Sequence, residues 1–121
     1  MVGSKRGFID RNGHVAVPFE FDLVLSFSEG LAPVLIGNLW GYIDRTGKTV
    51  ISPRFDRAFP FKESLAPVQY DGKWGYIDKT GQFVIEPQFE GAYPFSEGLA
   101  MVKVGKTVGY IDKTGRYIRV L

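Results

Sequence analysis

The chain has 121 residues, of which 45% are hydrophobic, and 15 Lys and Arg against 13 Asp and Glu leave a net charge of +2. A chain of this size buries roughly two thirds of its unfolded surface, which fits one domain or a short repeat array and excludes disorder. The near balance of charge gives no bulk attraction to nucleic acid or to an anionic membrane. With no Cys and one His, the chain lacks the side chains for a Cys-based zinc site, a His-rich metal site or thiolate catalysis.

A strict internal period organises the sequence. The tetrapeptides GFID, GYID, GYID and GYID begin at Gly7, Gly41, Gly75 and Gly109, so the same motif recurs every 34 residues. Other landmarks hold the same register, among them a Gly that closes the following turn and a Leu-Ala pair near the end of each full unit. The period therefore predicts one repeat domain with a leader, three full units and a partial fourth, at residues 1–6, 7–40, 41–74, 75–108 and 109–121.

The contents of each unit favour strands over helices, because Gly and Pro recur at intervals too short for a helix. In the third unit, alternation of apolar and polar residues predicts a first strand over residues 74–78 and a tight turn over 78–81. A second strand over 82–86 is expected to end at Pro87, which cannot donate to a strand ladder. A third strand over 99–104 pairs with the first strand of the next unit.

The segment between the second and third strands carries aromatic residues that we expect to turn inward. In the third unit these are Phe89, Tyr93 and Phe95, followed by a short helical turn around residues 96–98. The segment would then cross over from the second strand to the third with its aromatic side chains in the core.

Each tight turn begins with Asp and ends with Gly. Asp10, Asp44, Asp78 and Asp112 take the first position, where a carboxylate accepts backbone N–H groups two residues on. We favour this structural role over calcium binding, which needs several oxygen ligands in one loop. Gly81 and its equivalents are expected to adopt the left-handed conformation.

The Trp-Gly pairs Trp40-Gly41 and Trp74-Gly75 admit two interpretations. The two Trp side chains either pack in the core between units, with each Gly leaving room for a facing aromatic ring, or form an exposed stripe that holds sugar rings or peptide prolines. We favour packing, because every stacked unit must bury the same face.

Two units resemble a known family. Residues 40–73, WGYIDRTGKTVISPRFDRAFPFKESLAPVQYDGK, and 74–106, WGYIDKTGQFVIEPQFEGAYPFSEGLAMVKVGK, are similar to bacterial WG repeats, also called KWG repeats, and the similarity extends over residues 7–121. Arg6 and Val108 replace the repeated Trp in the outermost units, which fits end positions. The resemblance implies a binding or scaffolding module.

A row of cations follows the turn Asp residues. Arg11, Arg45, Lys79 and Lys113 share one repeat position, and stacked units would align them as a basic stripe for an acidic peptide or phosphates. The alternative is a solvated turn kept soluble by its cations. A competing acidic row, Glu29, Glu63 and Glu97, is expected elsewhere on the surface.

The sequence thus predicts an all-β fold, an open twisted array of antiparallel three-stranded repeats, with a closed β-trefoil-like barrel or a small β-propeller as alternatives. An open array leaves an exposed terminal strand around Ile118, available for a protein or peptide partner or for self-association.

We expect a non-catalytic protein-binding or peptide-binding module without cofactors, since no phosphate loop or catalytic triad pattern is present. Alternatives are a glycan or cell-wall binding module and an immunity or inhibitor protein for a bacterial toxin. No nucleic-acid or membrane partner is expected, and the absence of a signal peptide or an apolar stretch of membrane-spanning length predicts a soluble, cytoplasmic chain as given.

Overall fold

The computed structural model describes the backbone of residues 6–9 and 15–120 and the side chains of residues 21–118. Within these ranges the chain is all β and contains no helix. The strands are β1 Arg6–Ile9, β2 Val15–Phe21, β3 Leu23–Val24, β4 Ala32–Ile36, β5 Leu39–Ile43, β6 Thr49–Phe55, β7 Arg57–Ala58, β8 Ala66–Tyr70, β9 Lys73–Ile77, β10 Phe83–Phe89, β11 Gly91–Ala92, β12 Ala100–Val104, β13 Thr107–Ile111 and β14 Tyr117–Val120. No described helix is long and apolar enough to span a membrane.

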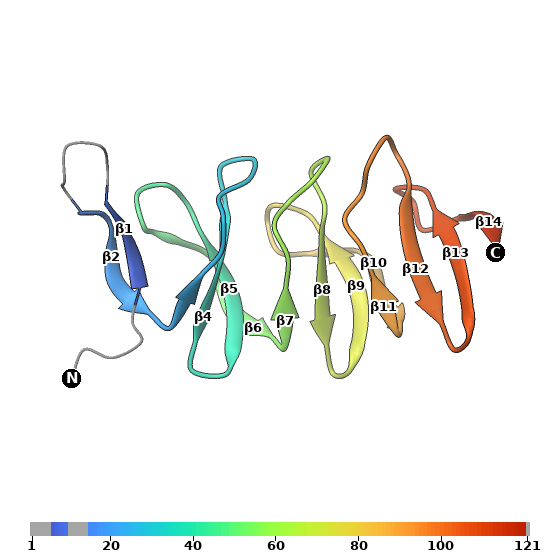
Figure 1. Cartoon of the computed structure of the whole chain (residues 1–121), viewed down its shortest axis with the longest axis horizontal. Helices are drawn as coiled ribbons and strands as arrows, with labels where there is room; N and C mark the ends of the chain where they lie inside the picture. The colour runs from blue at the N-terminus through green and yellow to red at the C-terminus, as the bar shows by residue number, and fades with distance from the viewer. Residues whose placement is uncertain (1–5, 10–14, 121) are drawn as a thin grey trace.

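The strands form a row of separate antiparallel sheets. The two-stranded sheet β1–β2 is followed by three four-stranded sheets, β3–β6, β7–β10 and β11–β14, each paired in chain order. Figure 1 shows these sheets succeeding one another along the longest axis, with β1 and β2 at one end of the row and β14 at the other. None of the described sheets closes on itself, so the predicted open repeat array is confirmed and the closed alternatives do not apply.

The sheets have four strands where three were expected, because a short strand follows each long one. β7 has only two residues, and Arg57 and Ala58 pair with Gln69 and Val68 of β8. Two residues carry no readable alternation, so the sequence pattern does not reveal such a strand. Each four-stranded sheet also takes β-strands from two successive 34-residue units, which offsets the structural unit from the sequence repeat.

The expectation that Pro87 ends the second strand is wrong, since β10 continues to Phe89. The register against β9 shifts between Ile85, which faces Tyr76, and Phe89, which faces Trp74. Four residues of β10 therefore pass two residues of β9, and Pro87 lies inside this bulge on an edge strand. A residue without an N–H is tolerated at such a position.

The segment from β11 to β12 also differs from expectation. It forms a tight turn closed by an isolated bridge between Ser96 and Leu99, without a helical turn. Phe95 is buried, but Tyr93 is 53% exposed and only its backbone carbonyl reaches the core, where it accepts a hydrogen bond from the Tyr76 hydroxyl at 2.7 Å. Glu97 lies in this turn with a φ of 54°, a conformation shared by Glu29 and Glu63.

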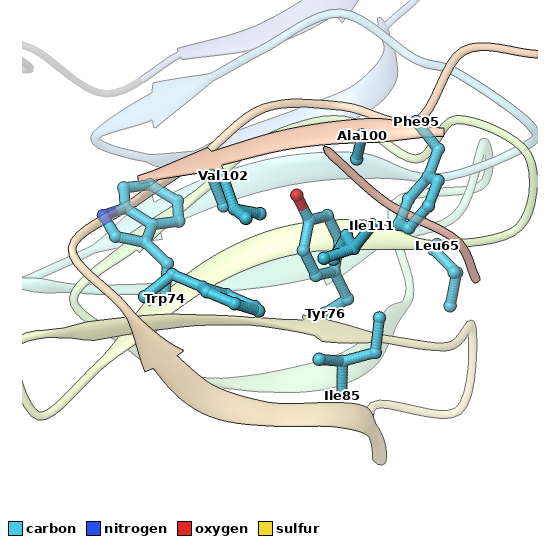
Figure 2. Packing of buried hydrophobic residues seen from close by; sticks show 10 residues of the cluster. Leu65, Trp74, Tyr76, Ile85, Phe95, Ala100, Val102 and Ile111 are labelled. Atoms are coloured by element: carbon cyan, nitrogen blue, oxygen red, sulfur yellow. The ribbon is translucent and has the colours of Figure 1, made fainter. Parts of the chain in front are cut away.

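The hydrophobic core lies between successive sheets. Figure 2 shows one such layer, in which Trp74, Tyr76 and Ile85 of the sheet β7–β10 face Ala100 and Val102 of the next sheet. The preceding layer repeats the arrangement, with Tyr42 and Ile51 facing smaller residues of the following sheet such as Ala66 and Val68. Each internal sheet therefore packs large side chains against the sheet that follows it in the row, its forward face. Against the sheet that precedes it, its backward face, it packs smaller side chains. Figure 2 labels the forward and backward residues Leu65, Trp74, Tyr76, Ile85, Phe95, Ala100, Val102 and Ile111.

Candidate functional site

The Asp turns have the predicted structure at the three described positions. The Asp78 Oδ1 atom accepts hydrogen bonds from the Thr80 N–H at 2.9 Å, the Thr80 hydroxyl at 2.5 Å and the Gln82 N–H at 3.2 Å. Gly81 closes the turn with a φ of 91°, which confirms its left-handed conformation. The Thr80 hydroxyl, followed by the backbone donors, holds the pKa of Asp78 below its usual value. Asp44 and Asp112 repeat these bonds, and Asp10 lies outside the described residues.

These turns also lock neighbouring sheets together. The Gly81 Cα lies so close to Ile51 of the preceding sheet that an added Cβ would stand 3.0 Å from the Ile51 Cγ2. The Arg54 guanidinium donates a hydrogen bond to the Gly81 carbonyl. Gly115 is placed in the same way against Ile85, so each of these turns packs directly on the preceding sheet. This purely structural role accounts for the Asp and Gly positions.

The described cations of the predicted basic row all interact with other side chains of the chain. The Lys79 Nζ lies 3.4 Å from a Glu29 carboxylate oxygen, and the Lys113 Nζ lies 3.3 Å from a Glu63 oxygen. Arg45 has a partner of a different kind, with its Cζ 5.3 Å from the centre of the Phe27 ring. Arg11 lies outside the described residues. The expectation that the acidic row lies elsewhere is therefore wrong at both described pairs, where carboxylates neutralise the cations.

The acidic row is itself part of the junction between sheets. The Glu63 carboxylate accepts the Glu97 N–H at 2.5 Å and the Gly98 N–H at 2.9 Å. The Gly98 donor contributes most to keeping the pKa of Glu63 below its usual value. Glu29 accepts the Ser64 N–H at 2.9 Å, and although burial opposes ionisation, backbone donors and a lysine lower its pKa overall.

The Trp side chains pack between sheets, as favoured from the sequence. Trp74 is 7% exposed and stacks on Phe59, with ring centroids 5.3 Å apart and planes inclined by 17°. Trp40 is half-buried and lines a small apolar pocket of about 160 Å³. These positions leave no continuous exposed Trp stripe across the described units.

The Gly after each Trp is required for a reason other than the one expected. A Cβ at Gly75 would lie 2.5 Å from the Ile85 carbonyl oxygen and 2.8 Å from the Pro87 nitrogen. Gly41 is equally close to the backbone of β6. The backbone of the bulged neighbouring strand occupies the space that a Cβ would need at Gly41 and Gly75. The expectation that an aromatic ring lies there is wrong.

The edge of β14 offers a surface that the fold does not use. β14 is the last strand of its sheet and pairs only with β13, through a bulged register. Tyr117 and Ile118 are 47% and 53% exposed. An apolar pocket of about 250 Å³ opens beside the strand and is lined by Val104, Thr107, Gly109 and Tyr117. Sequence reasoning singled out Ile118, whereas the pocket depends on packing between strands and has no local sequence signal.

The equivalent edges of the internal sheets are less suited to pairing with another chain. Val50 and Val84 occupy the position of Ile118 on β6 and β10 and are 45% and 47% exposed. However, β6 and β10 each contain a bulge and a Pro, at Pro53 and Pro87, and both features blunt an edge strand. β14 also carries a bulge, but the repeat position of Pro53 and Pro87 is occupied by Leu121 in the sequence.

The geometry offers no site for metal chemistry in the described part of the chain, where no three His, Cys, Asp or Glu side chains come together. What it defines is a class of protein, an open β-repeat array of 34-residue units stacked through their sheet faces. The chain belongs to the WG-repeat family: the family described as WG containing repeat matches residues 7–40, 40–74 and 74–107. Neither the curated proteins nor the solved structures include a significant match to it.

Proposed function

We propose that this WG-repeat array is a non-catalytic module that binds an extended peptide segment of a partner protein by strand addition at β14. The observation that carries the proposal is the edge itself. β14 pairs on one side only, contains no Pro in its described residues and exposes Tyr117 and Ile118 beside an apolar pocket.

Strand addition uses two properties of such an edge. The unpaired backbone N–H and C=O groups supply affinity that is independent of sequence, and pockets for alternate side chains supply specificity. Side chains of an added strand alternate between the two sheet faces. Those on the face of Tyr117 would reach the pocket of about 250 Å³, and those on the other face would lie near Ile118.

The test compares Pro substitutions on two edges of the full chain. The probe is a fluorescently labelled peptide selected against the full chain from a displayed library of random decapeptides. Ile118→Pro removes a backbone donor from β14 and should abolish binding while leaving the circular dichroism spectrum nearly unchanged. Val84→Pro places the same change on β10 and should leave binding intact. Undiminished binding to a folded Ile118→Pro chain would overturn the proposal.

The glycan alternative has less support, because it needs exposed Trp rings and Trp74 is only 7% exposed. Collisional quenching of tryptophan fluorescence checks this reasoning, since Trp74 should be protected and Trp40 partly accessible. No observation on the described residues favours an immunity or inhibitor role over general peptide binding.

A further inference from the structure

The small apolar pocket beside Trp40 lies between two internal sheets of the row. It has a volume of about 160 Å³, and it opens to solvent where Arg57 and Phe59 are exposed. One side is formed by β3, β5 and the residue after β3, and the other side by β7 and the residue after it. We name it the Trp40 pocket, and its lining residues are Leu23, Leu25, Trp40, Arg57, Ala58 and Phe59.

The next unit along the row shows which group fills the equivalent space. Leu25 and Trp40 correspond, 34 residues further on, to Phe59 and Trp74. The Phe59 ring stacks on the Trp74 indole, with ring centroids 5.3 Å apart and planes inclined by 17°. Trp74 is 7% exposed, whereas Trp40, beside the smaller Leu25 side chain, is half-buried. The Trp40 pocket therefore lies where the neighbouring unit carries an aromatic ring.

The size and the lining of the pocket define the chemistry of its ligand. A cavity of about 150 Å³ accommodates one benzene ring, so the Trp40 pocket has room for a single aromatic side chain. All of its lining residues except Arg57 are apolar, which disfavours a sugar ring because its hydroxyl groups would lose their hydrogen bonds to water. Arg57 is exposed, and within the described part of the chain its guanidinium forms no hydrogen bond or ion pair. A carboxylate next to the bound ring would pair with it.

We infer that the Trp40 pocket binds an aromatic side chain of a partner protein, from a segment in which an acidic residue follows the aromatic one. The ring stacks on the Trp40 indole as Phe59 stacks on Trp74, and the carboxylate pairs with Arg57. The apolar lining recognises the ring, and the charge of Arg57 adds selectivity for the acidic neighbour. This site is separate from the edge of β14, because it lies between the sheets β3–β6 and β7–β10 and needs no strand addition.

The experiment follows the indole N–H signals of the isotope-labelled full chain by nuclear magnetic resonance. Trp40 and Trp74 are the two tryptophans of the chain, and Trp40→Phe assigns their signals. The probe is the peptide acetyl-Gly-Phe-Asp-Gly-amide. The Trp40 signal should shift and saturate as peptide is added, while the Trp74 signal stays in place. A peptide with Leu in place of Phe should bind about fivefold more weakly, and one with Asn in place of Asp about threefold more weakly.

Two variants of the chain test the two halves of the site. Leu25→Phe supplies the ring from the chain itself, so it should weaken binding of the peptide by about tenfold or more. Val50→Phe adds a ring on the same sheet at a Val that is 45% exposed, and it should leave binding unchanged. Arg57→Gln should weaken binding of the Asp peptide by about threefold and leave binding of the Asn peptide unchanged. Because Arg57 is exposed, this variant keeps the test open if Leu25→Phe unfolds the chain.

A further control separates this site from the edge strand. Ile118→Pro should leave the response of the Trp40 signal unchanged, since that substitution affects only β14. An unshifted Trp40 signal at millimolar peptide, or equal binding of the Leu and Phe peptides, would overturn the inference. Undiminished binding to a folded Leu25→Phe chain, equal losses for the Asp and Asn peptides in Arg57→Gln, or a Trp40 shift abolished by Ile118→Pro would overturn it as well.

Discussion

Gly75→Ala tests how closely the strands β9 and β10 approach. The added Cβ would lie 2.5 Å from the Ile85 carbonyl oxygen, 2.8 Å from the Pro87 nitrogen and 2.9 Å from the Glu86 carbonyl carbon. All three atoms belong to the backbone, so no side chain can rotate away to relieve the contact. The backbone of β10 must move, and its bulge packs against the buried core next to Trp74.

The expected cost follows from that contact. Forcing one extra carbon into a packed interior costs about 1–3 kcal/mol, and the Ala side chain regains part of this by restricting the unfolded chain. We expect Gly75→Ala to lower the free energy of unfolding by about 2 kcal/mol. For a chain of this length each kcal/mol shifts the melting temperature by roughly 3–5 °C, so the melting temperature should fall by about 6–10 °C.

Gly91→Ala is the matched control. Gly91 also lies on a strand, but a Cβ there would meet only the Lys103 Cβ at 3.5 Å, an ordinary contact distance. Thermal and urea unfolding followed by circular dichroism measure both variants. Equal stabilities of the Gly75→Ala and Gly91→Ala chains would refute the close approach of the two strands.

Three further perturbations test other parts of the structure. Gly81→Val should cost more than about 1 kcal/mol in the free energy of unfolding, because it places a β-branched residue at a φ of 91° and against Ile51. Tyr76→Phe should cost about 1 kcal/mol, since the Tyr93 carbonyl loses its hydrogen bond at 2.7 Å. Lowering the pH below about 4 should destabilise the fold, because the pKa of Asp78 is lower in the folded chain than in the unfolded one, so protonation favours unfolding. Urea midpoints measured for each variant, and across pH 5 to 3 for the last, provide the checks.

Each of these three has a variant that isolates its cause. Gly72→Val adds a side chain at a similar φ of 82° with no neighbour within 4 Å, so its difference from Gly81→Val reports packing against the preceding sheet. Tyr110→Phe removes a hydroxyl without a described partner and should be nearly neutral. Asp78→Asn keeps an acceptor but cannot titrate, so it should reduce the acid dependence, to which Glu29 and Glu63 still contribute. If Tyr76→Phe lowers the free energy of unfolding no more than Tyr110→Phe does, the hydrogen bond to the Tyr93 carbonyl does not stabilise the fold. If stability falls with pH as steeply in Asp78→Asn as in the original chain, Asp78 does not contribute to the acid dependence.

Features determined by a few neighbouring residues were predictable from the sequence. Asp78 and Gly81 identify their turn because a short carboxylate and a left-handed Gly satisfy local backbone geometry. The repeat array was predictable from the 34-residue period, because stacked units must present the same faces to one another. The place of Ile118 on the last strand was also predictable, whereas its role in binding stays a prediction.

Features that depend on the stacking distance between units were not predictable. Lys79 and Glu29 are fifty positions apart in the numbering, and only the stacked sheets bring them within 3.4 Å. Pro87 continues a strand because a bulge at an edge removes the need for its N–H, and the pairing partner sets that bulge. Tyr93 was expected inside because it is aromatic, yet its carbonyl is the group that the core uses.

The open stacking of the sheets is tested most directly by nuclear Overhauser contacts between methyl groups and turn protons in the full chain. The structure predicts contacts from the Ile51 methyl to the Gly81 α protons and from the Ile85 methyls to those of Gly115, one pair at each of the two junctions between four-stranded sheets. All contacts between sheets should connect neighbours in the row. A set of contacts joining β1–β2 to β11–β14 within one monomer would show a closed ring and would contradict the open array.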